Sequence, residues 1–322
     1  MKRNYLRKLL LSPESRLLMT SDAYTEAMMI CFPPSLSGSQ IQPQSFWDEI
    51  PSYKDETKKA IKAIADDLKK YSEVAAIPIS VEYSSDELPE GTIAYHRIKG
   101  TILSESYYWF STKQFEQDLL TAESNPNISV HFVHINSGGG EAWYLDRLSD
   151  TMRSLSKPIY VLFEKIGGSA AYYIGCHGST VNTLTKNDSI GCIGTMVSFY
   201  DFEGYYKKLG INKVEEYATK SDLKNKKYKD LKEGHPEQYI REELDPLCEQ
   251  FISEVKLSRP ALSKLPEDDP VFRGETFDAI TAQQKGLVDG ISTISEAISE
   301  AYNIGQEWLT KQKTQSQILQ YL

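Results

Sequence analysis

Cysteine is scarce in this 322-residue chain, and its four copies form no motif. Cys31, Cys176, Cys192 and Cys248 are far apart and have neither a CxxC pair nor the Cys/His spacing of a zinc site. This pattern argues against structural disulfides and bound zinc, and it suits reduced cysteines in a protein core. We therefore expect no metal and no cofactor.

Long apolar runs are absent as well. No stretch approaches the ~20 apolar residues that a membrane-spanning helix needs. The basic start of the chain is followed by three leucines at 9–11, but Ser12, Pro13 and Glu14 end this run before a signal-peptide core develops. The sequence thus predicts no membrane span and a cytoplasmic location.

A surplus of basic charge is also missing. The net charge is −9, from 36 Lys and Arg residues against 45 Asp and Glu residues. This balance argues against a nucleic-acid partner and favours plain solubility. Hydrophobic residues make up 40% of the chain and charged residues 25%, which is ordinary for a globular protein.

The sequence does contain a dense set of motifs between residues 130 and 178. Residues 130–135 predict a short buried strand that ends in a glycine turn at 137–140. Helical spacing of apolar residues predicts a helix over 145–155, and residues 159–163 predict a second buried strand. Alternation of strands and helices of this kind favours a parallel α/β core.

Ser169 follows two glycines and precedes a run of small and apolar residues that predicts a helix. A hydroxyl at a helix N-terminus lies where the helix dipole and unpaired amides favour developing negative charge. Glycines on the neighbouring turn let backbone N–H groups approach a reacting atom closely, because no Cβ intervenes. A serine facing such donors has the geometry that acyl transfer needs.

Three motifs in order carry a family resemblance: INSGGG at 135–140, GGSAAYYIGC at 167–176 and NDSIGCIGTMV at 187–197. Together they resemble the protease domain of the signal peptide peptidase A (SppA) family, which are serine–lysine proteases of the ClpP/crotonase superfamily. The resemblance implies an α/β fold with ClpP/crotonase-like repeated ββα units and parallel sheets over residues 76–305. It also implies a peptide or protein substrate and assembly of identical chains into a ring.

The resemblance makes Ser169 the nucleophile. The oxyanion donors would be the backbone N–H groups of Gly139 or Gly140 and of Ala170. Family members usually have proline where this chain has Gly138, so we expect a more flexible turn here.

The base must come from elsewhere in the chain. ClpP-like enzymes have a histidine about 25 residues after the nucleophile, but none of the five histidines (His96, His131, His134, His177 and His235) lies near residue 194. A Ser-His-Asp triad is therefore disfavoured. A lysine can act as base if desolvation and neighbouring positive charge lower its pKa by several units.

The basic segment 220–229 offers several lysines. Ser221–Asn225 best fits the family pattern around the catalytic lysine, which makes Lys224 the predicted base, with Lys220, Lys227 and Lys229 as alternatives. Ser189 resembles the family's S-x-G serine, which hydrogen-bonds that lysine.

The flanking segments lie outside the resemblance. We expect an N-terminal helical extension in residues 1–75, with 17–19 in a short helix and 58–71 in a longer one. It would cap the protease domain, or else act as an oligomer contact or an arm controlling substrate entry. Residues 236–255 predict a long helix that Pro246 kinks. Residues 306–322 predict a polar tail, either loose or forming a strand that contacts a partner.

The leading hypothesis is thus a serine endopeptidase with a Ser-Lys dyad, processing phage or prophage capsid proteins or cleaved signal peptides. One alternative is a crotonase-like acyl-CoA enzyme that uses the glycine hole without a nucleophile, although no acidic residue follows the hole at an evident catalytic spacing. A second alternative is a catalytically silent assembly or scaffold protein of the same fold.

Overall fold

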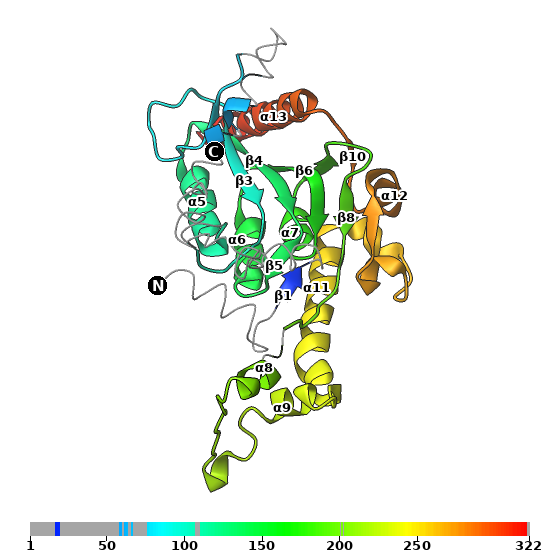
Figure 1. Ribbon diagram of the computed structural model, residues 1–322. Helices are drawn as coiled ribbons and strands as arrows, with labels where there is room; N and C mark the ends of the chain where they lie inside the picture. The colour runs from blue at the N-terminus through cyan, green and yellow to red at the C-terminus, as the bar shows by residue number, and fades with distance from the viewer. Residues whose placement is uncertain are drawn as a thin grey trace, which may run out of the picture.

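The computed structural model describes residues 17–19, 58–59, 61–63, 66, 76–106, 110–199, 201 and 203–320 (Figure 1). The described strands are β1 (Leu17–Met19), β2 (Ile79–Ser80), β3 (Thr92–Lys99), β4 (Ile128–Ser137), β5 (Gly139–Glu141), β6 (Ile159–Gly168), β7 (Thr180–Thr183), β8 (Ser189–Gly191), β9 (Thr276–Asp278) and β10 (Gly290–Ile291).

The described α-helices are α5 (Thr112–Ser124), α6 (Leu145–Ser154), α7 (Ala170–Gly175), α8 (Glu203–Lys208), α9 (Lys226–Lys232), α10 (Glu237–Tyr239), α11 (Asp245–Ser258), α12 (Ala279–Lys285) and α13 (Ile294–Gln320). Three short 3-10 helices, η1 (Thr219–Ser221), η3 (Pro260–Lys264) and η4 (Pro270–Arg273), and the π-helical segment η2 (Ile240–Leu244) complete the set. The described residues of 58–66 are helical too.

One sheet organises the molecule. Its strands run in the order β10-β7-β6-β4-β3-β2, and each neighbouring pair is parallel. Strand β8 pairs with the far end of β6 in parallel and with β9 in antiparallel fashion. The predicted α/β core with a parallel sheet is therefore confirmed, and helices connect successive strands in this core.

Both faces of the sheet are covered, so its central strands β3 and β4 are buried along almost their whole length. Side chains alternate between the faces with a period of two. On β4, Val130 and Phe132 belong to the cluster that also contains residues of α13, whereas Val133 and Ile135 pack with residues of α5, α6 and α7. Figure 1 shows α13 on one side of the sheet and these helices on the other.

Local sequence features explain where three helices lie or end. Ser111 caps α5, since its side chain accepts a hydrogen bond from the Gln114 N–H, and Asn125 ends the same helix. The predicted helix over 145–155 is α6, and Gly286 ends α12 with a φ of +85°.

The predicted long helix over 236–255 is confirmed, since α10, η2 and α11 follow one another from residue 237 to 258, and the kink at Pro246 stays a prediction. Two other predictions for the flanks were wrong. Residues 17–19 form strand β1 rather than a helix, because they pair with β5 far along the chain. Residues 306–320 are neither loose nor a strand, because they continue helix α13.

The end of α5 depends on a buried lysine. Lys157 is 4% exposed, and its ammonium donates to the backbone oxygens of Ala122, Glu123 and Asn125 at 2.8, 2.7 and 2.6 Å. Burial lowers the pKa of Lys157 to about 8, so the side chain is still mainly protonated at pH 7. The amine thus adds a charged donor to three carbonyl groups at the C-terminal end of α5, of which Ala122 and Asn125 also accept a backbone N–H group.

We predict that Lys157→Met lowers the free energy of unfolding by about 2–4 kcal/mol, because three buried acceptors lose a charged donor. Urea unfolding at pH 7 measures this change. The matched control is Lys186→Met, at an exposed lysine, for which we expect a change within about 0.5 kcal/mol. Equal effects of the two substitutions would mean that the ammonium does not stabilise the helix end.

Candidate active site

The candidate site lies where β4, β6 and β8 end together. Ser137, at the end of β4, pairs with Gly167, and Gly168 pairs with Gly191 of β8. The next residue after Gly168 is Ser169, whose N–H donates to the Gly191 carbonyl oxygen at 2.8 Å. These pairings bring the three sequence motifs to one edge of the sheet.

Ser169 has an unusual backbone conformation. Its φ of 55° and ψ of −122° place a non-glycine residue in a region that only glycine adopts readily. Such strain amounts to on the order of 1–3 kcal/mol and persists only where the surrounding structure enforces it. Here the hydrogen bond to Gly191 and the buried helix α7 on its other side hold the residue in place.

The Ser169 hydroxyl is buried and free of strong partners. The residue is 1% exposed, and among the described residues Oγ has no hydrogen-bond partner of good geometry. The Cys192 thiol is its polar neighbour: burial raises the pKa of Cys192, and the Ser169 hydroxyl partly opposes that rise. A buried hydroxyl without a partner needs an explanation, and a catalytic role is one of those available.

The glycine turn lies beside this serine, because α7 packs against β5. Gly139 has a φ of 101°, and its N–H donates to the Ser137 hydroxyl at 3.1 Å. The Ile102 backbone bridges to β5, as its N–H donates to the Gly139 oxygen at 3.0 Å and its oxygen accepts from the Glu141 N–H at 2.8 Å. A Cβ on Gly140 would overlap the Ile102 backbone, so only glycine fits there.

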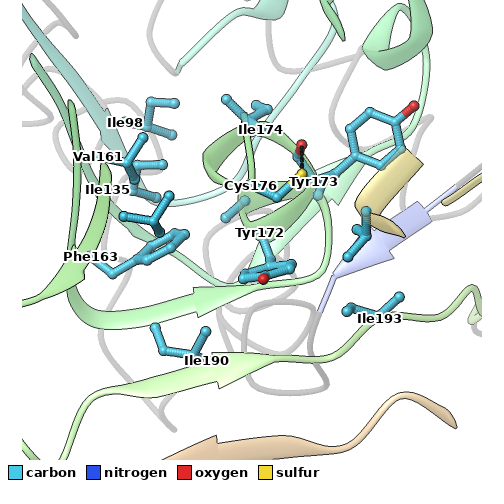
Figure 2. Packing of buried hydrophobic residues seen from close by; sticks show 14 of the residues in the cluster. Ile98, Ile135, Val161, Phe163, Tyr172, Tyr173, Ile174, Cys176, Ile190 and Ile193 are labelled. Carbon is cyan, nitrogen blue, oxygen red and sulfur yellow. Dashed lines mark hydrogen bonds between the residues drawn. The ribbon is translucent and has the colours of Figure 1, made fainter. Parts of the chain in front are cut away.

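Helix α7 is anchored deeply under the site. All six of its residues are buried, and Phe163 of β6 stacks on Tyr172 with ring centroids 6.0 Å apart. Figure 2 shows Phe163, Val161 and Ile135 on one side of this helix and Tyr173 on the other. Ala170 is its first residue, so its N–H has no acceptor within the helix. The structure thus brings Ser169, Ala170 and the glycine turn together.

The lysine segment lies elsewhere. Residues 203–235, which we call the arm, include α8, η1 and α9 and project from the lower end of the molecule in Figure 1. Lys220 and Lys224 are exposed there, and Lys229 lies over the Tyr217 ring at 4.2 Å. Lys227 forms ion pairs with Glu243 and Glu242, and the hydrogen bond to Glu243 raises the pKa of the Lys227 amine above its ordinary value. None of the four amines is bonded to Ser169 within one chain.

Ser189 lies close to the site but at the other end of β8. It pairs with Ile166 on one side and Asp278 on the other, whereas the Ser169 N–H reaches Gly191, two residues further on. Two residues along a strand correspond to about 7 Å. Ser189 is thus on the strand that supports the nucleophile, and no lysine of the arm meets it in the single chain.

The buried histidines have partners of their own. His131 contacts His96 at 3.1 Å and Glu123 at 3.2 Å, and His134 contacts the Tyr95 hydroxyl at 2.8 Å. Burial lowers the pKa of all three of these histidines.

His177, at the end of α7, is bound to Glu254 at 2.9 Å. Burial alone would lower its pKa, but the Cys176 sulfur and the Glu254 carboxylate raise it to about 10. His177 is therefore a protonated structural group rather than a base.

Sequence reasoning missed two parts of the site. Ile102 fixes the glycine turn through its backbone, which no side-chain motif could signal. Cys192 has a φ of 55° and donates its N–H to the Glu275 oxygen at 2.8 Å, so the chain is strained on both sides of the Ser169 hydroxyl. The position of Cys192 directly after the S-x-G motif is the sequence feature that could have indicated its place in the site. Among the described residues, no three His, Cys, Asp or Glu side chains gather as metal ligands, and no helix is long and apolar enough to cross a membrane.

The model of peptidase family S49 matches residues 151–307, which include Ser169, Ser189 and Lys224. A putative signal peptide peptidase SppA of Enterococcus faecium is 24% identical over 198 residues, which cover 59% of this chain and 56% of that protein. Protease 4 of Haemophilus influenzae is 25% identical over 187 residues, which cover 57% of this chain and 29% of that protein.

The chain thus spans about half of the first relative's length and under a third of the second's. Among solved structures, a mutant ClpP1 from Listeria monocytogenes is similar over 63% of this chain and 94% of its own, with a TM-score of 0.41 and 15% identity. The family model and the two relatives confirm the predicted resemblance to the SppA-type peptidases.

The strain at Ser169 yields a stability prediction. We expect the free energy of unfolding to be about 1 kcal/mol higher for Ser169→Gly than for Ser169→Ala, because glycine adopts this φ and ψ without a Cβ penalty. Both variants lack the hydroxyl, so the comparison isolates the backbone. Chemical denaturation measures it, and a less stable glycine variant would mean that the backbone here is not strained.

The His177–Glu254 pair yields a pH prediction. The folded state retains a proton between pH 6.5 and about 10 that the unfolded state releases, so the pair's contribution to stability falls as the pH rises through this window. We expect the loss of stability caused by His177→Gln to shrink by more than about 1 kcal/mol across the window. His235→Gln, at an exposed histidine, is the matched control variant. A constant His177→Gln effect would contradict the raised pKa.

Proposed function

We propose, from the match of residues 151–307 to the model of peptidase family S49, that the chain is a serine endopeptidase that cleaves peptide bonds with a Ser-Lys dyad. The observation that carries the proposal is Ser169 itself. It is a buried, strained serine with an unpartnered hydroxyl, next to a glycine turn and at the start of a buried helix. A purely structural N-cap serine would bond its own helix amides and would need no strain.

The proposed chemistry has two steps. Ser169 Oγ forms a bond to the substrate's carbonyl carbon as a lysine amine takes its proton, and the carbonyl oxygen becomes an oxyanion. N–H groups of Gly139 or Gly140 and of Ala170 stabilise that charge, and each such donor typically lowers the activation barrier by about 3–4 kcal/mol. The leaving amine takes the proton from the lysine, and water then releases the acyl group from Ser169 by the same route in reverse.

The base in this proposal is Lys224 from a second copy of the chain. Within one chain the arm carries its lysines away from Ser169, and the arm also exposes large apolar side chains: Tyr205, Tyr206, Leu209, Ile211, Val214 and Leu223. Such a surface is suited to burial against another subunit. Burial in that interface would desolvate the amine and lower its pKa toward neutrality, as a base requires.

Ser189 completes the proposed constellation as a positioning residue. From the strand next to Ser169, its hydroxyl would accept a hydrogen bond from the arriving amine and hold it toward Oγ. The substrates we propose are extended protein segments, such as phage or prophage capsid proteins or cleaved signal peptides. Repetition of the head-to-tail contact between arm and site would close a ring of identical chains.

A complementation experiment tests this proposal. We expect Ser169→Ala and Lys224→Met each to abolish casein hydrolysis, with fluorophosphonate labelling lost in the first variant and strongly slowed in the second. After subunit exchange, a 1:1 mixture should regain about a quarter of wild-type activity, because random mixing gives one site in four both intact groups.

The control is Lys264→Met at an exposed lysine outside the arm, which should retain full activity. Activity that survives in Ser169→Ala would refute the nucleophile. If mixing restores nothing although exchange is complete, the same test with Lys220, Lys227 and Lys229 identifies the base, and failure of all four excludes the dyad.

A further inference from the structure

The chain's own residues 17–19 lie against the glycine strand of the site. Strand β1 is antiparallel to β5, with Leu17 opposite Glu141, Leu18 opposite Gly140 and Met19 opposite Gly139. Figure 1 shows β1 beside β5, next to α7, and in Figure 2 the pale blue arrow of β1 passes near Tyr173 and Ile193. A segment from the start of the chain therefore occupies the surroundings of Ser169.

The backbone groups of β5 show which edge β1 uses. The Gly139 oxygen and the Glu141 N–H are both bonded to Ile102, on one side of the strand. Because successive residues of a strand point their backbone groups to opposite sides, the Gly140 N–H and oxygen face the other way, toward Leu18. β1 thus engages the one edge of β5 that Ile102 leaves open.

This edge is what an extended peptide needs in order to bind beside Ser169. Peptides bound by strand addition gain their affinity from main-chain hydrogen bonds to an open strand edge. The backbone of Gly140 can pair with only one strand on that side at a time. A substrate segment and residues 17–19 therefore compete for the same donors and acceptors.

We propose that residues 17–19 act as a built-in competitive inhibitor, which must leave β5 before a substrate peptide can pair with it. This inference rests on the peptidase function proposed above and concerns how that site is controlled. Tethering to the same chain gives the segment a high effective concentration at the site, so a short pairing is enough to compete. The pairing involves three residues in the part of the chain that the structure describes, and a longer substrate strand would be able to displace these three.

The test compares Leu18→Pro with Leu18→Ala in the full chain. Proline has no N–H to donate to Gly140 and disfavours pairing at that position, whereas alanine keeps the backbone unchanged. With a fluorogenic peptide, we expect Leu18→Pro to lower KM at least threefold with kcat unchanged and to speed fluorophosphonate labelling of Ser169. Leu18→Ala should behave as wild type. An unchanged KM and labelling rate in Leu18→Pro would overturn the proposal.

Two further measurements keep the outcome clear. Hydrogen exchange should show faster exchange in the peptide containing 139–141 for Leu18→Pro, with β4 and β6 as protected internal references; unchanged exchange would overturn the proposal whether or not the enzyme is active. A synthetic peptide with the sequence of residues 12–24 should inhibit Leu18→Pro competitively, and a peptide that does not compete would count against it.

Failure of the peptidase function is distinguishable from failure of this inference. If wild type, Leu18→Pro and Ser169→Ala all lack hydrolysis and labelling, the proposed function fails, and the exchange data alone decide whether β1 covers β5. If labelling depends on Ser169 but Leu18→Pro changes neither KM nor exchange, the peptidase stands and the inhibitory strand is refuted.

Discussion

The site depends on one backbone contact, the hydrogen bond from the Ser169 N–H to the Gly191 oxygen. It continues the pairing of β6 with β8 by one residue beyond the regular strand, just where the chain must turn into α7. Because the turn is made at a serine rather than a glycine, the backbone is strained there. The strain is tolerated only because both the sheet and the helix are fixed independently.

The sheet and the helix are fixed by burial from two sides. Strands β4 and β6 present alternate side chains to α13 on one face and to α5, α6 and α7 on the other, so a shift in register would disrupt the packing on both faces at once. Phe163 adds a specific constraint under α7, since its ring fills the space left by Gly167 and Gly175. A core packed in this way leaves Ser169, at its edge, little room to change its backbone conformation.

Sequence was informative where local chemistry determines structure. The two central strands, helix α6 and the turn with Ser169 could be predicted because apolar periodicity and glycine pairs act over a few residues. Strand β1 could not be predicted, since Leu17, Leu18 and Met19 suit a helix or a strand, and only pairing with the distant edge of β5 decides between the two. The course of the arm was equally hidden, because the same lysine motif fits a segment against Ser169 or one projecting from the molecule. Residues 1–16 and 20–57 lie outside the described residues, so the helical extension expected there stays a prediction.

The positions of β1 and of the arm have a common consequence for the proposed chemistry. Under the proposed mechanism, a strained serine beside oxyanion donors would be hazardous in a free chain, because it could attack any unfolded segment. In the single chain, however, the open edge of the glycine strand is paired with β1 and the lysines of the arm lie away from Oγ. Under the proposed mechanism, hydrolysis then requires two separate events: displacement of a strand and arrival of an amine. Because the first responds to substrate and the second to assembly, activity would rise steeply only where both an extended peptide and the assembled ring are present.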